Sequence, residues 1–158
     1  MNLKRLQKPC FVAGALVPLA CLCCLPFFHT WPGRRFLLFY FAPIVAMAFL
    51  WGGLRVAELD FYARGQLALD AVVLGGALAR FVIGEVLPFS GHMLFFAYTL
   101  LTTRETWYRS LCLLLILETT WFKLHVWKDW KTWAVGSVSG LVFGVAWWVF
   151  GKRKRRAL

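Results

Sequence analysis

The sequence predicts an all-α integral membrane protein, a compact bundle of about six transmembrane helices. The first observation behind this prediction is composition, because 61% of the 158 residues are hydrophobic and the mean hydropathy is +0.67. A soluble domain of this length could not cover so much apolar surface. The second observation is that the apolar residues form runs close to the roughly 17–25 residues that cross a bilayer as a helix.

Short turns separate the apolar segments. The segment between the first two runs, TWPGRR at 30–35, carries the Pro and Gly expected of a turn. Few residues remain for loops, so we expect one transmembrane helical domain over residues 1–158, with no soluble domain. The predicted segments cover about residues 10–28, 36–54, 66–88, 92–103, 109–127 and 132–150.

The sixth segment carries three glycines at four-residue spacing, Gly136, Gly140 and Gly144. In a membrane helix this spacing clears a groove in which a neighbouring helix packs closely. We therefore expect these glycines to have a packing role and no chemistry.

The net charge of +11 comes from basic residues at the segment ends. This placement is typical of membrane topology, and we expect no nucleic-acid partner. The basic residues are in excess on the side of both termini, which predicts that both termini are cytoplasmic. The closing run KRKRR at 152–156 is expected to contact anionic lipids. We expect a bacterial inner membrane with the site facing the periplasm, although an endoplasmic reticulum protein with a lumenal site would carry the same charge bias.

Ionisable residues at membrane depth are default candidates for a functional site. His92 opens the fourth segment, and His125 closes the fifth. Because neighbouring helices in such a bundle run antiparallel, both histidines are expected on the same face. With both termini cytoplasmic, that face is the exoplasmic one.

The stretch LHVWKDW at 124–130 places Asp129 four residues after His125, on one helix face if the helix continues. Asp129 could then accept the imidazole Nδ1–H and leave Nε2 available to attack or bind. Glu118 lies seven residues before His125 on the same stripe. Lys123 and Lys128 add positive charge, which suits an anionic substrate.

The stretch PFSGHMLF at 88–95 precedes the fourth segment. Ser90 and Gly91 before a helix can leave backbone N–H groups pointing outward, and the helix N-terminus adds partial positive charge. His92 stands in the first turn of this helix. Arg80, earlier in the third segment, is expected to face the same cavity. Ser90, Gly91 and Arg80 are therefore predicted to bind phosphate.

Ser90-Gly91-His92, followed by His125 and Asp129, resembles the motifs of the type-2 phosphatidic acid phosphatase superfamily. The likeness covers about residues 88–150, and the first 80 residues match only in helix count. The resemblance implies that His92 is the acid that protonates the leaving group. It implies that His125 is the nucleophile that forms a phosphohistidine, and that Asp129 orients His125.

The chain departs from the family pattern at three places. Phe89 is inserted between Pro88 and the Ser-Gly-His, Glu118 and Thr119 stand where the family has Ser-Arg, and no Arg-Pro dipeptide occurs. In this stripped form the chain is similar to the fat-storage-inducing transmembrane family. Members of that family look like lumenal phosphatases of lipid or acyl-CoA diphosphates.

These observations predict a membrane-embedded phosphatase or phosphotransferase that acts on a lipid phosphate or diphosphate, with no metal or other cofactor. The alternative is a non-catalytic protein on a degraded phosphatase-like fold, which binds a lipid, a partner membrane protein or a second copy of itself. A metal or haem site would use His92, His125 and either Glu118 or Asp129, but lysines beside His125 disfavour a cation. A channel or transporter is a further alternative, and the single-sided placement of the histidines argues against it.

Overall fold

The computed structural model describes residues 7–24, 42–57, 62–83 and 87–156. Within these ranges the chain forms helices joined by turns and no strand, which confirms the all-α class. Contacts divide the chain into two compact units, Met1–Phe61 and Tyr62–Leu158. The single domain predicted over residues 1–158 stays a prediction.

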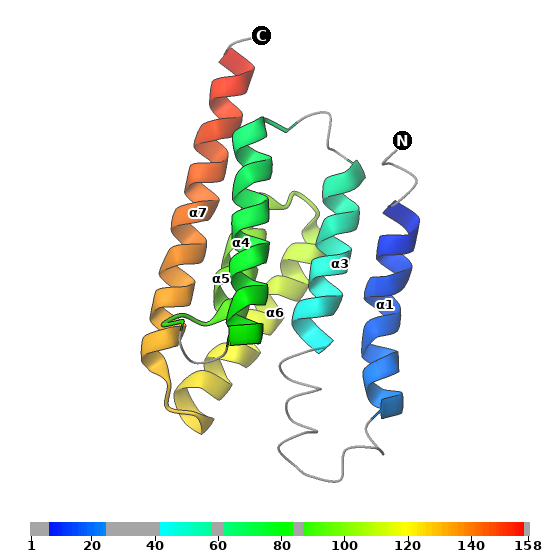
Figure 1. Ribbon diagram of the computed structural model, residues 1–158, viewed down its shortest axis with the longest axis vertical. Coiled ribbons are helices and arrows are strands. Elements are labelled where there is room, and N and C mark those ends of the chain that lie inside the picture. The colour runs from blue at the N-terminus through cyan, green and yellow to red at the C-terminus, as the bar shows by residue number, and fades with distance from the viewer. Residues whose placement is uncertain (1–6, 25–41, 58–61, 84–86, 157–158) are drawn as a thin grey trace. The chain divides into compact units, whose positions relative to one another are not determined.

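The first unit consists of two apolar helices, α1 (Gln7–Cys24) and α3 (Ala42–Ala57), that pack against each other (Figure 1). The approach is close at Gly14, where a Cβ would lie 2.8 Å from Cγ of Leu50. Both helices fall within or near the predicted segments 10–28 and 36–54. Residues 25–28 and 36–41 of those segments lie outside the described residues.

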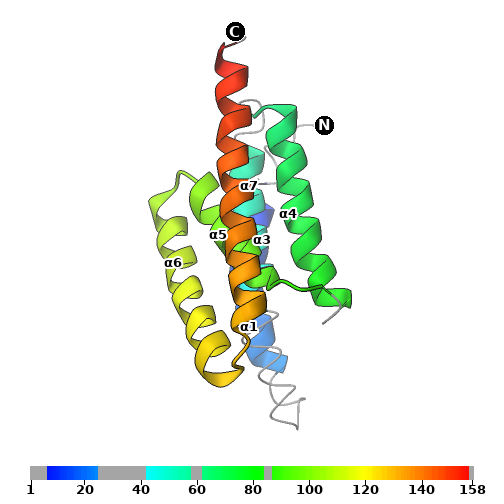
Figure 2. The same ribbon diagram turned by 90° about the vertical axis from the view of Figure 1, so that its left-hand side faces the viewer.

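The second unit is built around α5, which packs on α4, α6 and α7 (Figure 2). All positions of α5 from Gly91 to Thr99 are buried, as expected for a helix that is apolar on every side. Its 12 residues span about 18 Å, well short of a bilayer core. The helices of this unit are α4 (Arg64–Ile83), α5 (Gly91–Thr102), α6 (Thr106–Trp121), the π-helix η6 (Phe122–Val126) and α7 (Trp130–Arg156).

The glycines of α7 allow close packing against α5, as predicted. A Cβ at Gly136 would lie 2.5 Å from the Ser90 carbonyl oxygen, and one at Gly140 would lie 2.6 Å from the Leu94 carbonyl oxygen. Gly144 faces the Leu101 side chain at 2.7 Å in the same way. The spacing of four residues places all three on the side of α7 that meets α5.

Successive helices of this unit reverse direction, so the end of α4, the start of α5, the end of α6 and the start of α7 lie at one end of it (Figures 1 and 2). This confirms that His92 and His125 belong to the same end. The π-helix η6 extends beyond the start of α5 (Figure 2).

One helix among the described residues is long and apolar enough to cross a membrane by length and composition. It is the 23-residue stretch Trp130–Lys152 of α7, with a mean hydropathy of 1.6. Shorter apolar stretches occupy Gln7–Cys21, Ala42–Ala57 and Gly91–Thr102. The membrane placement of the other segments stays a prediction.

Candidate functional site

The start of α5 is held by its own side chain and by α7. Ser90 is the N-cap, and its Oγ accepts a hydrogen bond from Met93 N at 3.4 Å, as serine commonly does before a helix. The Ser90 N–H donates to the Thr132 carbonyl oxygen at 2.8 Å. The Ser90 N–H, which the sequence suggested for an anion, is therefore already used inside the protein.

Gly91 is required where α5 meets α4. A Cβ at this position would lie 2.9 Å from the Ala77 carbonyl oxygen and 3.4 Å from Cβ of Arg80. Any larger residue would push α5 away from α4. Gly91 thus serves close packing, and it brings the start of α5 beside Arg80.

Arg80 fixes the turn before α5. Its Nε donates to the Phe89 carbonyl oxygen at 2.9 Å. Within the described part of the chain, the guanidinium makes this one hydrogen bond, through Nε. Both Nη groups therefore remain available to an anion. The structure therefore places Arg80 beside Phe89 and Gly91 at the start of α5, and phosphate binding by Arg80, Ser90 and Gly91 stays a prediction.

His92 lies in the first turn of α5 with its side chain largely buried, at 9% exposure. Its ring meets the Phe96 ring edge to face, with centroids 5.9 Å apart. Both residues lie one turn apart on the same helix, so the contact is set by helix geometry.

The end of α6 differs from the regular helix that the sequence suggested. The chain widens into η6, where Trp127 N donates to the Phe122 carbonyl oxygen at 2.9 Å, five residues back. Lys128 then adopts a positive φ of 53°, and the chain turns into α7. Because the helix ends before Asp129, His125 and Asp129 do not share a helix face.

His125 is exposed and is oriented by the backbone of α6. Its Nδ1 lies 3.2 Å from the Trp121 carbonyl oxygen, and its ring stacks on the Trp121 ring with centroids 5.8 Å apart. No hydrogen bond joins His125 to Asp129, both of which are described, so the expected pairing of these two side chains is wrong. A carbonyl oxygen only accepts, so Nδ1 is the donor and the neutral ring keeps its lone pair on Nε2.

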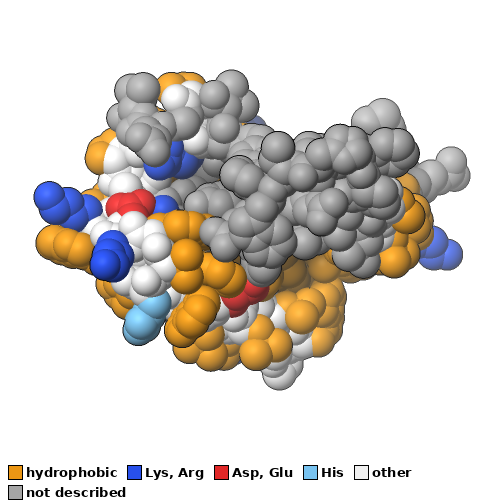
Figure 3. Space-filling model, turned by 90° about the horizontal axis from the view of Figure 1, so that it is seen from below, with side chains coloured by type: hydrophobic (Ala, Val, Ile, Leu, Met, Phe, Trp, Pro, Cys, Tyr) orange, Lys and Arg blue, Asp and Glu red, His pale blue; other side chains and the backbone are white. Residues whose placement is uncertain are grey.

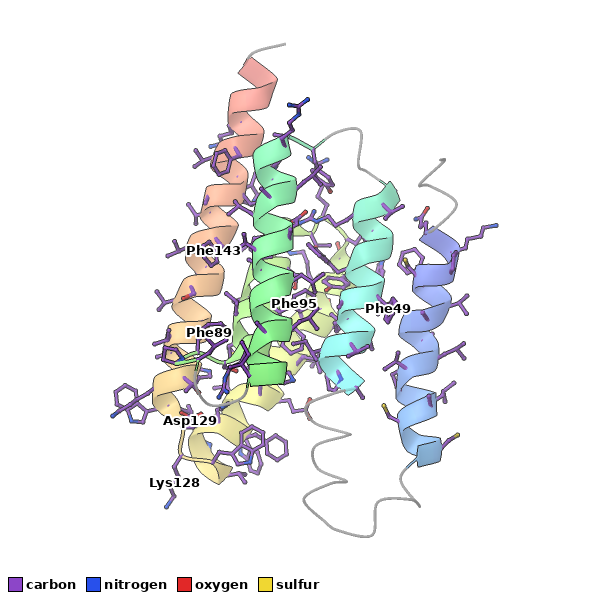
Figure 4. The ribbon with its side chains drawn as sticks, in the orientation of Figure 1. Phe49, Phe89, Phe95, Lys128, Asp129 and Phe143 are labelled. Atoms are coloured by element: carbon purple, nitrogen blue, oxygen red, sulfur yellow. The ribbon has the colours of Figure 1, made fainter. Side chains whose placement is uncertain are left out.

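Asp129 instead belongs to a cluster that we name the clasp, formed by Lys123, Asp129 and Thr132. Lys123 Nζ lies 2.6 Å from Asp129 Oδ2 and 3.2 Å from Thr132 Oγ1. Thr132 N donates to Asp129 Oδ1 at 3.3 Å, and its hydroxyl donates to Asp129 Oδ2. Asp129 therefore caps the start of α7 and ties it to Lys123 in η6 (Figure 4).

The clasp sets the charge state of Asp129, which lies in the turn between η6 and α7. Partial burial acts to raise the pKa of this carboxyl. Hydrogen bonds from Lys123 and Thr132, with the Lys123 charge, outweigh burial and hold the pKa below its ordinary value. The Lys123 side chain is 9% exposed and its charge is matched by Asp129, while its predicted role in substrate binding stays a prediction.

Lys128 and Glu118 remain on the surface. Lys128 projects away from the helices at the turn (Figure 4). Glu118 lies on the exposed side of α6, seven residues before His125. Lys or Arg side chains, an acidic side chain and a histidine lie on the left of the face seen from below, and further acidic atoms lie near its centre among hydrophobic side chains (Figure 3).

Thr132 was not among the site residues predicted from the sequence. The signal was present, because Asp129 stands three residues before Thr132 at the start of an apolar helix, and this pattern is typical of an N-cap. The same Asp129 also fitted a partner for His125, four residues away, and the sequence alone does not decide between the two.

The described residues form no group of three His, Cys, Asp or Glu side chains that could hold a metal ion. His92, His125, Glu118 and Asp129 are all described, so the metal or haem site considered from the sequence is not assembled.

The chain matches no protein-family model, no curated protein and no solved structure. The resemblance to the type-2 phosphatidic acid phosphatase superfamily therefore stays a prediction carried by the motif residues.

Proposed function

We propose that the protein spans a membrane and that the end holding His92 and His125 faces the exoplasmic side. The composition and the 23-residue apolar stretch of α7 support this placement. Large apolar side chains are also exposed along α6 and α7, among them Leu114, Leu117, Val138 and Val142. Such surfaces are stable when they face lipid. The bacterial inner membrane, with a periplasmic site, is the proposed location.

At this end we propose the hydrolysis or transfer of a phosphate carried by a membrane lipid. The observation that carries the proposal is the orientation of His125, whose Nδ1 is engaged by the Trp121 carbonyl oxygen. The lone pair on Nε2 is then available at an exposed position, as a nucleophile requires. The backbone carbonyl performs the orienting role that the sequence assigned to Asp129.

The proposed reaction has two steps. In the first, His125 Nε2 forms a bond to phosphorus, the bond from phosphorus to the leaving oxygen breaks, and His92 gives that oxygen a proton. In the second, water attacks the phosphohistidine, His92 takes the water proton, and the phosphorus–nitrogen bond breaks. The Arg80 Nη groups and Lys128 would balance the phosphate charge, and no metal or other cofactor takes part.

The experiment is phosphate release by the purified protein, beside His125→Ala and His92→Ala. The panel holds phosphatidate, phosphatidylglycerol phosphate, a polyprenyl diphosphate and acyl-CoA. We expect His125→Ala to lose activity and His92→Ala to be slower by about 10²- to 10⁴-fold. Equal release by wild type and His125→Ala would contradict the proposal.

A second candidate is a non-catalytic protein that binds a lipid phosphate or a partner membrane protein, including a second copy of this chain. The observation that favours it is the clasp, because Lys123 and Asp129 neutralise each other rather than serving a substrate. This candidate predicts that a bound lipid keeps its phosphate after long incubation. Anionic lipids at the basic end of α7 are proposed as partners under either candidate.

A further inference from the structure

Two consecutive turns of α7 hold the backbone of Ser90. The Thr132 carbonyl oxygen accepts the Ser90 N–H at 2.8 Å. One turn later, a Cβ at Gly136 would lie 2.5 Å from the Ser90 carbonyl oxygen and 3.0 Å from its nitrogen. Ser90 is the N-cap of α5 and stands two residues before His92. The position of His92 therefore depends on where α7 begins.

The start of α7 is in turn fixed to η6 by the Thr132 side chain. Its hydroxyl is bonded to Asp129 and lies 3.2 Å from Lys123 Nζ. Lys123 is two residues before His125 in η6. Thr132 thus contacts Ser90 before α5 through its carbonyl oxygen and Lys123 of η6 through its hydroxyl.

We propose that Thr132 is a positioning residue that sets the start of α5, with His92, relative to η6, with His125, an inference that rests on the proposed function. Thr132 acts through the Ser90 N–H and through the clasp. The two histidines come from different helices, and the described contacts place the clasp between their backbones. A shift at Thr132 changes the placement of Ser90, and His92 follows because it lies in the same first turn.

The informative variant is Thr132→Val, which keeps the shape and the backbone carbonyl but removes the hydroxyl. Lys123 and Asp129 then lose one hydrogen-bond partner, and the first turn of α7 is no longer fixed to η6 by its side chain. Thr132→Ser restores the hydroxyl. Asp129→Asn disrupts the same clasp by removing its carboxylate charge. This variant replaces Thr132→Val in the experiment if Thr132→Val does not fold.

The matched control is Thr120→Val. Thr120 Oγ1 accepts a hydrogen bond from Trp133 Nε1 at 2.9 Å, so it also links α6 to α7. Among the described contacts it does not reach Ser90 or the clasp. Thr120→Val therefore measures the general effect of removing a hydrogen bond between α6 and α7.

The experiment measures the histidine ring signals of the full-length protein by NMR, with rings labelled by isotope. The sequence holds three histidines, and His92→Ala and His125→Ala assign two of them. We expect Thr132→Val to shift the His92 ring signals, Thr132→Ser to keep them, and Thr120→Val to leave them in place. Unchanged His92 signals in Thr132→Val, or an equal shift in Thr120→Val, would overturn the inference.

Kinetics provide a second readout. In Thr132→Val we expect kcat to fall by about 10- to 100-fold, because small displacements of reacting groups are costly, while KM stays within about twofold. Activity in Thr120→Val is expected to match wild type. Wild-type kcat in Thr132→Val, accompanied only by lower thermal stability, would make the clasp purely structural.

The two failures are distinguishable. If wild type and His125→Ala release phosphate equally, the proposed function fails, and the ring signals still decide whether Thr132 places His92. If His125→Ala is inactive while Thr132→Val keeps its kcat and His92 signals, the function stands and the inference fails.

Discussion

At the residue scale, Asp129 shows how one side chain can fit two roles in the sequence and take one in the structure. Its oxygens bind Lys123 and Thr132, while His125 is oriented by the Trp121 carbonyl oxygen. Removing the Asp129 charge should therefore affect stability and the start of α7 and leave the orientation of His125 unchanged.

Asp129→Asn leaves Lys123 largely buried without its counter-charge. We expect the free energy of unfolding to fall by about 1–3 kcal/mol, less than for a fully buried pair, because the Asp129 side chain is 33% exposed. Denaturant unfolding in detergent measures this change. The control is Lys131→Ala, an exposed position expected to stay within about 0.5 kcal/mol of wild type. Loss of the Nδ1-protonated form of the His125 ring in Asp129→Asn would show that Asp129 does orient His125.

The clasp also predicts a pH dependence of stability. The pKa of Asp129 is lower in the folded protein than its ordinary value of 3.8, so the carboxylate form stabilises the fold. This contribution is complete above the ordinary pKa and is lost as the pH falls through the lower, folded value. We expect the difference in Tm between wild type and Asp129→Asn to be constant near neutral pH and to shrink below about pH 4. A difference that does not change on acidification would exclude titration of Asp129 as its source.

At the element scale, the helices were predictable and the end of α6 was not. Hydropathy located both ends of α5 and the start of α7 within two residues, because each helix contains a continuous apolar run. The hydropathy pattern carries no information about η6 or the positive φ of Lys128. A π-helix changes the spacing of the backbone hydrogen bonds without changing which residues are apolar. The pairing of His125 with Asp129 assumed a regular helix through residue 129 and failed for this reason.

The contact between α5 and α7 gives a prediction at this scale. Gly136→Ala would place a methyl group against the Ser90 backbone, and we expect a loss of about 1–3 kcal/mol in stability. Gly75→Ala is the matched control, because nothing lies within 4 Å of a Cβ at that position of α4. It should be neutral or stabilising by up to about 1 kcal/mol, since alanine favours helix more than glycine does. Equal effects of the two substitutions would mean that the two helices do not pack as described.

At the scale of the whole molecule, the proposed function depends on membrane placement and orientation. The composition predicts several spans, and α7 meets the criteria of length and hydropathy. The 12-residue α5 is too short to cross alone, and its burial among α4, α6 and α7 explains how so short an apolar helix is stable. The sequence identified the end of the molecule that holds the histidines, because alternating helix direction follows from short connections.

The orientation is testable with reporters fused to each terminus. The excess of basic residues near both termini predicts that both reporters are cytoplasmic, while a thiol label at Lys128→Cys should be reached from the exoplasmic side. A control at Lys152→Cys, at the other end of α7, should be reached only from the cytoplasmic side. Labelling of both positions from one side would contradict the proposed topology.

The most direct test of nucleophilic catalysis by His125 is to trap the phosphoryl group on this residue. The purified protein is mixed with a radiolabelled lipid phosphate or diphosphate, quenched in alkali to preserve phosphohistidine, and digested for peptide mapping. We expect label on the peptide containing His125, at Nε2, and none in His125→Ala. Turnover of the substrate with no label on His125, or equal turnover by His125→Ala, would contradict nucleophilic catalysis by His125.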